Sequence, residues 1–470
     1  MEDLMADVKE ENPGDVIHSG DVLKIQFTDV GTFDCLCDVE WSFVVFTTKV
    51  TVCVTMGLPE EAPVTAGVDS EESKKEDEGM SCVCSTTSNC RNSEDEVFLK
   101  NQLLLKMPGF VIKEMQWKER AEEEKMQTGL LGSIRRVTVN GVLGKQFKKL
   151  DLIWKGLPPE GIHRDLVVQG KMALKEACFY NRVGPALQAI VDELTSRNGV
   201  SSYRLLFPRC FSMCPDSEVL ILEDMLPAGY HMPDVKKGLS IKEINCALFQ
   251  QAAISAASLA YQVHKKVDLE DAFPLADPNA TDVRSMVVGF INEGFENLNR
   301  VLAGIPDERH EYNDGVSWVR KAIAEALSFQ PRLGSVRTLC HGDLWANNLL
   351  FRERSGMLEC MLIDWQFMES GLPTSDLPFL FLASATLNAQ QVKEVLDTWW
   401  GYLTHNLNLL QVSLSDIHYD RAQCDWDFHQ SLRSGVVMWI ASMDILSQTE
   451  PQRRRILHYL KLLPLIDAII

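Results

Sequence analysis

The sequence of 470 residues has no run of about 18 apolar residues, so it predicts no transmembrane helix. Its start, MEDLMADVKEENPGD, is acidic, whereas a signal peptide has a positively charged start followed by an apolar stretch. Basic residues are few, with 46 Lys and Arg against 66 Asp and Glu, whereas nucleic-acid binding needs a basic face. We therefore expect a cytoplasmic protein with no membrane partner and no nucleic-acid partner, and the sequence leaves its oligomeric state open.

The segment 1–96 lacks the sustained apolar patterning of the rest of the chain. Residues 1–100 hold 22 acidic and 7 basic residues, and part of this segment reads AGVDSEESKKEDE. Such a composition buries too little apolar surface to offset the entropy of ordering. Only residues 23–56 have strand-like character. We predict an acidic, largely disordered extension, whose cysteines lack the usual zinc-site spacing and are expected to be free thiols.

From residue 97 the pattern becomes globular. We expect two short helices in 97–120, separated at Pro108-Gly109. The stretches 129–139 and 150–157 read as strands joined by a turn, and 171–191 reads as a helix. Further strands are expected at 203–211 and 219–223. The chain from Ile241 onward is expected to be mainly helical, interrupted at 338–366 by strand, loop and strand.

The residues that indicate chemistry lie in 339–366, which reads LCHGDLWANNLLFRERSGMLECMLIDWQ. Asp343 can accept a proton from an attacking hydroxyl, and Asn348 on the same loop can bind a metal ion. Asp364 ends an apolar strand and can hold Mg²⁺ against nucleotide phosphates. Phosphoryl transfer requires such a set because it depends on positioning and charge neutralisation. H-x-D-x-x-x-x-N alone can arise by chance in a polar loop, but the strand ending in a second Asp makes chance a poor explanation.

HGDLWANN followed by IDWQ resembles the catalytic loop and metal-binding Asp of kinase-fold small-molecule phosphotransferases, among them aminoglycoside phosphotransferases and choline kinases. Trp345 and Gln366 favour the narrower ecdysteroid kinase-like (CHK kinase-like) family, in which H-G-D-x-W-x-x-N and I-D-[FW]-Q are typical. The resemblance covers about residues 97–470. It implies an α+β, bilobal protein-kinase-like fold, with a small β-rich N-lobe over 97–224, a mainly helical C-lobe over 225–470 and ATP bound between them.

The resemblance also implies residue roles in the C-lobe. Asp343 would be the catalytic base, and Asn348 and Asp364 would be the Mg²⁺ ligands. His341 would hold the shape of the loop. Asp376, in GLPTSDLPFL, would brace the loop through hydrogen bonds.

In the N-lobe, the resemblance calls for a strand Lys that contacts the α- and β-phosphates and a helix Glu that pairs with it. Lys155, in LIWKGLPP, and Glu176, in MALKEACFY, fit these places. Taken alone, Lys155 reads better as a solvent-facing lysine at an edge strand, and the downstream motif is what favours phosphate contact. Lys171 and Lys175 are weaker rivals, which we expect to face solvent from the helix.

Two further N-lobe segments are expected near the nucleotide. Gly129, Gly132 and Ser133, in GLLGSIRRVTV, stand where a hairpin would cover the phosphates, since glycine lets backbone N–H groups approach closely. Glu223 and Met225, in LILEDM, stand at the hinge, where main-chain groups would hold adenine. As bare patterns, the first also describes an ordinary turn and the second an edge strand.

The function implied is an ATP- and Mg²⁺-dependent kinase that phosphorylates a hydroxyl of a small organic acceptor, with ecdysteroids or other sterols as the named candidates. Two other classes remain open. One is a non-catalytic kinase-fold module that binds a nucleotide or a partner. The other is a protein kinase, against which stands the short segment from Asp364 to Asp376 with no A-P-E after it.

Overall fold

The computed structural model of the chain describes residues 87–118, 133–158, 160–199, 203–212, 219–273, 284–329 and 334–469. The strand-like stretch 23–56 and the rest of 1–86 lie outside these ranges. The first described element is the helix α1 (Thr87–Lys106), which begins ahead of the predicted lobe boundary at residue 97.

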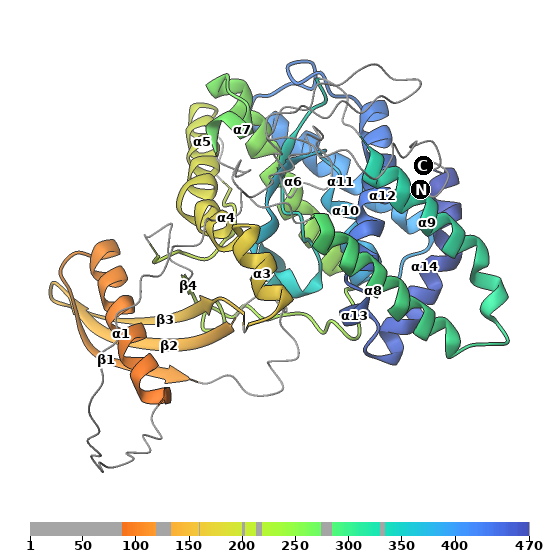
Figure 1. Ribbon diagram of the computed structural model, residues 1–470. Coiled ribbons are helices and arrows are strands. Elements are labelled where there is room, and N and C mark those ends of the chain that lie inside the picture. Colours follow the sequence, from red (N-terminus) through yellow and green to blue (C-terminus); the bar gives the residue numbers. More distant parts are fainter. Residues whose placement is uncertain are drawn as a thin grey trace, which may run out of the picture. The chain divides into compact units, whose positions relative to one another are not determined.

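The N-terminal lobe is built on a four-stranded antiparallel sheet in the order β1-β2-β3-β4. The strands are β1 (Phe110–Lys118), β2 (Ser133–Leu143), β3 (Gln146–Gly156) and β4 (Leu220–Glu223). Figure 1 shows α1 lying across this sheet. Leu99 and Leu103 of α1 are fully buried against Val139 and Trp154 of the sheet. Burial of these apolar side chains against one sheet face gives the lobe its core.

The two helices expected in 97–120 are one helix and one strand. Pro108-Gly109 does end α1, but the residues that follow form β1. Phe110 pairs with Leu143 and Lys118 with Arg136 along the whole strand. Burial alternates along most of β1, as period-two packing requires. The helix propensity of KEMQWKE is therefore overridden by pairing with β2.

The strand expected at 203–211 is also absent, since its described residues join the sheet only through a single bridge, Cys210 to Leu222. Pro208 lies just before that bridge and has no N–H to donate to a ladder. The strands expected in 129–139 and 150–157 and at 219–223 are confirmed as β2, β3 and β4, apart from residues 129–132, which lie outside the described ranges. A tight turn joins β2 to β3 through Gly144, whose φ is +62°.

The helix expected over 171–191 is confirmed, and it contains one irregular turn. α4 (Met172–Cys178) leads into a π-helical turn, η1 (Phe179–Val183), which leads into α5 (Gly184–Arg197). The short helix α3 (Ile162–Gln169) precedes them. Turns of π-helix often mark functional sites, and this one adjoins the candidate site described below.

The C-terminal lobe is mainly helical, as expected, and is arranged around α6 (Ile241–Lys265). A capping box between Ser240 and Glu243 starts α6. Much of the helix is buried and rich in alanine, which lets neighbouring helices approach closely. The remaining helices are α7 (Leu269–Ala272), α8 (Arg284–Ala303), η2 (Arg309–Tyr312), α9 (Asn313–Ser328), α10 (Asp376–Ser384), α11 (Ala389–Leu409), α12 (Arg421–Ala441), α13 (Met443–Leu446) and α14 (Glu450–Ile469).

The strands and loops expected at 338–366 are confirmed. β5 (Thr338–Cys340) pairs with β8 (Glu369–Gly371), and β6 (Leu349–Arg354) forms a hairpin with β7 (Met357–Leu362). Two short 3₁₀ turns, η3 (Ala346–Asn348) and η4 (Trp365–Phe367), lie between these strands. The loop after β5 and the residues after β7 carry the HGDLWANN and IDWQ motifs, so the two β pairs bring both motifs to one place.

The chain therefore has the α+β, kinase-like fold that the sequence predicted, with a small antiparallel sheet in its N-terminal lobe and a helical C-terminal lobe. Within the described residues, no helix is both long enough and apolar enough to cross a membrane.

Candidate active site

Lys155 joins three segments that are far apart in the sequence. From β3, its Nζ lies 2.6 Å from Glu176 Oε2 of α4 and 2.6 Å from Asp364 Oδ1 after β7. The side chains of Lys155 and Glu176 are 11% and 3% exposed, whereas Asp364 is 22% exposed. The predicted pairing of Lys155 with Glu176 is thus present, and Asp364 is the member of the trio that solvent reaches most easily.

The charges of this trio shift one another's protonation. Burial opposes the charge on Lys155, but the carboxylates of Asp364 and Glu176 outweigh it and raise the pKa of Lys155. Burial raises the pKa of Glu176 to about 7, and the positive charge of Lys155 limits that rise. Lys155 therefore stays cationic at neutral pH.

Asp343 and Asn348 form a second pair on the loop after β5. Asn348 Nδ2 donates to the Asp343 main-chain oxygen at 2.8 Å and to Asp343 Oδ2 at 2.9 Å. Both amide hydrogens are thereby used, and Asn348 Oδ1 accepts no hydrogen bond from any described residue. Burial, and then the charge of Asp364, raise the pKa of Asp343 to about 7, while Asn348 and the indole of Trp345 oppose the rise.

Both ring nitrogens of His341, the residue expected to hold the shape of the loop, make hydrogen bonds. Its Nδ1 accepts the Asp343 N–H at 3.3 Å, so its Nε2 carries the proton and donates to the Ile363 carbonyl at 2.8 Å. Burial lowers the pKa of His341, which favours this neutral form. Ile363 also donates its N–H to the Asn348 carbonyl at 3.0 Å, so two hydrogen bonds tie the Asp343 loop to the residue before Asp364.

Asp376, at the start of α10, braces the loop from the other side, again as predicted. Its Oδ2 accepts the His341 N–H and its Oδ1 accepts the Gly342 N–H, both at 2.9 Å. Gln251 of α6 donates a third hydrogen bond to Asp376 at 3.1 Å. Gly342 has a φ of +79°, and a Cβ added there would lie 2.2 Å from the Phe367 carbonyl oxygen, so only glycine fits this position.

The π-helical turn η1 supports Asp364. Asp364 itself has a φ of +66°, an uncommon backbone conformation for a residue other than glycine. Its N–H donates to the Tyr180 hydroxyl at 3.3 Å. The next residue, Trp365, stacks on Phe179 with ring centroids 3.8 Å apart and planes 7° apart. Two consecutive residues of η1 thus fix the backbone that presents Asp364.

The residues predicted near the nucleotide base and phosphates are only partly described. Gly129 and Gly132 lie outside the described residues, and Ser133 is the first residue of β2, paired with Gly156. The Glu223 N–H donates to the Arg209 carbonyl, and the Met225 carbonyl accepts from Ala228 and Tyr230. Met225 N–H has no acceptor among the described residues and is the main-chain donor left free at the predicted hinge.

The expectation that Lys171 and Lys175 both face solvent is half wrong. Lys171 is exposed, but Lys175 is buried, with 6% of its surface accessible. Its charge faces Glu369 of β8, a buried acid that the sequence reading did not single out. The sequence alone does not reveal the burial of Lys175 and Glu369, because it depends on tertiary packing. Helix α4 packs against η4 of the C-terminal lobe, so the side of α4 that carries Lys175 is shielded from solvent.

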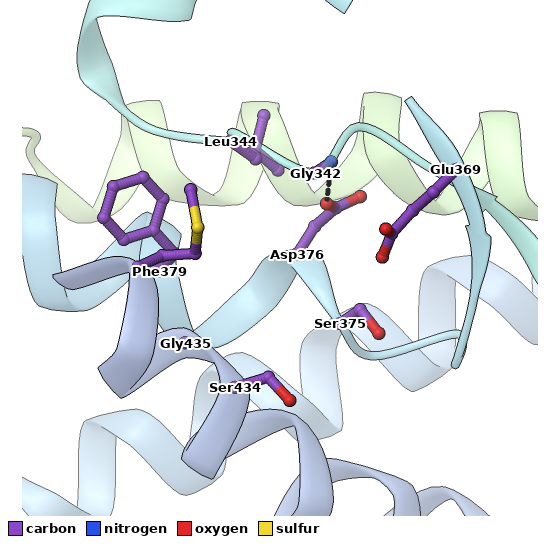
Figure 2. Close-up of a pocket in the computed structure, with 9 residues that line it drawn as sticks. Gly342, Leu344, Glu369, Ser375, Asp376, Phe379, Ser434 and Gly435 are labelled. Carbon is purple, nitrogen blue, oxygen red and sulfur yellow. Dashed lines mark hydrogen bonds between the residues drawn. The ribbon is translucent and has the colours of Figure 1, made fainter. Parts of the chain in front are cut away.

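A pocket adjoins the Asp343 loop, as Figure 2 shows. Its volume is about 40 Å³. Gly342 and Leu344, the two neighbours of Asp343 in the chain, contribute to its wall. The lining residues are Gly342, Leu344, Glu369, Ser375, Asp376, Phe379, Ser434, Gly435 and Met438.

Comparison with solved structures finds loose likenesses. A spectinomycin phosphotransferase solved with ADP and spectinomycin is 12% identical, over 74% of this chain and 98% of that chain, with a TM-score of 0.30. An amicoumacin kinase in complex with AMP-PNP, Ca²⁺ and Ami is 11% identical, over 78% and 94%, with a TM-score of 0.34. A microcompartment-associated aminopropanol kinase is 12% identical, over 72% and 94%, with a TM-score of 0.25. At these scores the likenesses carry no weight for function.

No curated protein matches the sequence at a significant level. A sequence profile does, over residues 129–412, which is more than half of the chain and includes Lys155, Glu176, Asp343, Asn348 and Asp364. That profile describes the ecdysteroid kinase-like family. The chain belongs to the ecdysteroid kinase-like family.

Proposed function

We propose that the chain is an ATP-dependent small-molecule kinase, which transfers the γ-phosphoryl group of MgATP to a hydroxyl of a small organic acceptor. The observation that carries the proposal is the meeting of Lys155, Glu176 and Asp364 beside the paired Asp343 and Asn348. Family membership supports the same reaction class. A non-catalytic module would have no chemical need to bring all five groups together.

Each residue has a chemical task in this reaction. Asp343 accepts the proton of the acceptor hydroxyl as its oxygen bonds to the γ-phosphorus, and the bond from that phosphorus to the bridging oxygen breaks to release ADP. Lys155, held by Glu176, contacts the α- and β-phosphates with its positive charge. Its present bond to Asp364 would be exchanged for phosphate oxygens when nucleotide binds. Asn348 and His341 keep the carboxylate of Asp343 in position.

The residues also fit a magnesium ion. Asn348 Oδ1 accepts no hydrogen bond from a described residue, and Asp364 is the more exposed carboxylate of its trio. Amide and carboxylate oxygens are the ligands that Mg²⁺ prefers, and a bound ion would neutralise phosphate charge there. Asp364 and Asn348 would hold it, with the Asp364 backbone fixed by Tyr180.

The family description names ecdysteroids, and we include these sterols and other hydroxylated small molecules among the acceptors to be tried. ADP release by the full chain with Mg²⁺ and ATP would be measured with each acceptor. We expect turnover with one acceptor class, which falls at least about 1,000-fold in Asp343→Asn because the general base is lost. Asp314→Asn, on the exposed start of α9, is the matched control. Full turnover in Asp343→Asn would exclude Asp343 as the base.

Binding tests the nucleotide half of the proposal separately from turnover. Asp343→Asn should bind ATP with little change in affinity. Asp364→Ala should lose the Mg²⁺-dependent part of its ATP affinity, which is the part that EDTA removes from the unaltered chain. Calorimetric titration with and without Mg²⁺ measures both. If Asp364→Ala kept its Mg²⁺-dependent affinity, the metal would have to be bound elsewhere.

A further inference from the structure

Gln251, near the middle of α6, is a buried residue to which the reaction described above gives no task. The residue is 2% exposed. Its Nε2 donates to Asp376 Oδ2 at 3.1 Å and to Ser255 Oγ at 3.3 Å. Its Oε1 accepts a hydrogen bond from the indole N–H of Trp399 on α11, a fully buried side chain. Gln251 therefore connects α11 to the carboxylate that braces the Asp343 loop.

The two partners of Gln251 fix which way its amide points. An indole N–H can only donate a hydrogen bond, and a carboxylate can only accept one. Only the orientation with Oε1 toward Trp399 and Nε2 toward Asp376 satisfies both partners. Trp399 thus keeps the donor end of Gln251 turned toward Asp376.

Asp376 extends this hydrogen-bond chain to the backbone beside Asp343. Its Oδ2, the atom that Gln251 contacts, also accepts the His341 N–H at 2.9 Å. Its Oδ1 accepts the Gly342 N–H at 2.9 Å, the bond drawn in Figure 2. The ring of His341 in turn accepts the Asp343 N–H. Hydrogen bonds therefore run without a break from α11 to the backbone of the proposed base.

Loss of the Gln251 amide would disturb both of its partners. Asp376 would keep two of its three donors, and the Trp399 indole would become a buried donor without its acceptor. Buried polar groups without partners are unfavourable, so the present arrangement of the carboxylate would lose stability relative to others. A displacement of Asp376 Oδ2 would reach the loop, because the same atom accepts a loop N–H.

The neighbouring glutamine of α6 shows that burial alone does not make this connection. Gln250 is 3% exposed, and its Nε2 has no hydrogen-bond partner among the described residues. A change of Gln250 therefore alters a buried side chain of the same type on the same helix and leaves the bonds of Asp376 intact. Comparison of the two glutamines separates an effect on Asp376 from a general effect of altering α6.

We propose that Gln251, oriented by Trp399, is a positioning residue that keeps Asp376 in place and thereby holds the loop that carries Asp343. Gln251 acts through Asp376 and does not itself touch the reacting groups. The role of Asp343 as the base rests on the proposed function, whereas the hold on the loop is a property of the chain without substrate. The two can therefore fail separately.

Hydrogen exchange in the full chain without ligand tests the hold on the loop. Mass spectrometry would follow deuterium uptake by the peptide that spans 338–349, with peptides of α8 and α9 as references for global opening. In Gln251→Met the loop peptide should take up deuterium at least about tenfold faster than in the unaltered chain, because local opening becomes easier. In Gln250→Met the uptake should be unchanged. Trp399→Phe keeps an aromatic ring without the indole N–H and should also accelerate uptake by the loop peptide.

Two results of the exchange measurement would overturn the inference. One is loop uptake that is no faster in Gln251→Met than in Gln250→Met. The other is an acceleration shared equally with the α8 and α9 peptides, since that would show only a less stable fold. Unchanged loop uptake in Trp399→Phe would overturn the part assigned to Trp399.

Turnover then tests the link to Asp343. With an acceptor that the unaltered chain phosphorylates, kcat of Gln251→Met should fall about tenfold or more, since misplaced reacting groups cost up to ~100-fold, while its calorimetric affinity for MgATP stays unchanged. Gln250→Met should keep its kcat. A loosened loop with full kcat would overturn the positioning role. If no acceptor gave turnover even with the unaltered chain, the proposed function would fail, and the exchange result would still decide whether Gln251 holds the loop.

Discussion

Lys155 is the residue on which most of the site's electrostatics depend. One ammonium group is ion-paired with two carboxylates, of which Glu176 is almost fully buried. Burying a charge is costly unless it is paired, and breaking a buried pair leaves the partner charge uncompensated. The residue therefore has a task in stability and, in the proposed reaction, a second one in phosphate binding, and the two can be measured apart.

Lys155→Met should lower both stability and nucleotide affinity. We expect a loss of about 3 kcal/mol in the free energy of unfolding, measured by urea titration, because Glu176 and Asp364 lose their counterion. Lys149→Met, at an exposed position of the same strand, should change stability by less than about 0.5 kcal/mol. In Lys155→Met/Glu176→Gln much of the lost stability should return while ATP affinity stays low. A double variant no more stable than Lys155→Met would argue against this buried pair.

Glu369 predicts a pH dependence of stability. Burial raises its pKa in the folded chain to about 8 from an ordinary value of 4.5. Between these values the folded chain holds a proton that the unfolded chain has lost, so the contribution of Glu369 to stability is largest below about pH 4.5 and falls as the pH rises to about 8. Relative to the unaltered chain, Glu369→Gln should therefore gain stability as the pH rises from 5.5 to 8, by no more than a few kcal/mol. Urea titrations across this range measure the difference, and a difference independent of pH would contradict the assignment.

At the scale of elements, the Asp343 loop is held by its backbone as much as by its side chains. The main-chain N–H groups of His341 and Gly342 donate to the Asp376 carboxylate, and that of Asp343 donates to His341 Nδ1. Such a loop keeps its geometry only if its backbone packs closely against the neighbouring chain. At Gly342 the backbone packs against the Phe367 carbonyl group and leaves no room for a Cβ.

Gly342→Ala should therefore be more damaging than Gly356→Ala. Both glycines have positive φ, +79° and +78°, so the backbone strain of an added Cβ is shared. A Cβ at Gly342 meets the Phe367 carbonyl oxygen, whereas nothing lies within 4 Å of one at Gly356. We expect Gly342→Ala to cost at least about 1 kcal/mol more unfolding free energy and to depress turnover, while Gly356→Ala keeps turnover. Equal effects of the two changes on stability and turnover would contradict this prediction, because they would show that the Asp343 loop can accommodate the added methyl group.

The π-helical turn gives a second prediction at this scale. Phe179→Ala removes the ring that stacks on Trp365 and should cost about 3–5 kcal/mol of unfolding free energy, as for other buried Phe to Ala changes. Phe147→Ala, at a ring that is 66% exposed, is the control and should cost under about 0.5 kcal/mol. Thermal or urea unfolding compares them. If the stacked ring could be removed at no greater cost than the exposed one, η1 would not support the Asp364 backbone.

The sequence predicts most of these helices and strands correctly, and the errors have physical causes. The β2–β3 hairpin, the helix over 171–191 and the strands around HGDLWANN carried strong local patterns. The local sequence predicts a helix where β1 forms, because the strand depends on pairing with β2, a tertiary contact that local propensity does not encode. The local sequence likewise predicts an exposed Lys175, because the burial of this residue depends on the contact of α4 with η4.

At the scale of the whole molecule, the site is assembled from separate parts of the chain, namely β3, α4, the loop after β5 and the residues after β7. The motif spacing could predict which residues matter, but not that Glu369 would line a pocket next to them. That arrangement depends on β8 pairing with β5, and on α10 and α12 closing the other walls. Residues of both lobes are thus required for the proposed reaction.

The most direct measurement is the fate of the γ-phosphoryl group. The full chain would be incubated with Mg²⁺ and ATP labelled at the γ-phosphate, together with a small-molecule extract and, separately, with protein from the same extract. Label should appear in the small-molecule fraction, and Asp343→Asn should abolish it. Label transferred to protein alone, or an equal amount of labelled product from Asp343→Asn, would contradict a small-molecule kinase that uses Asp343 as its base.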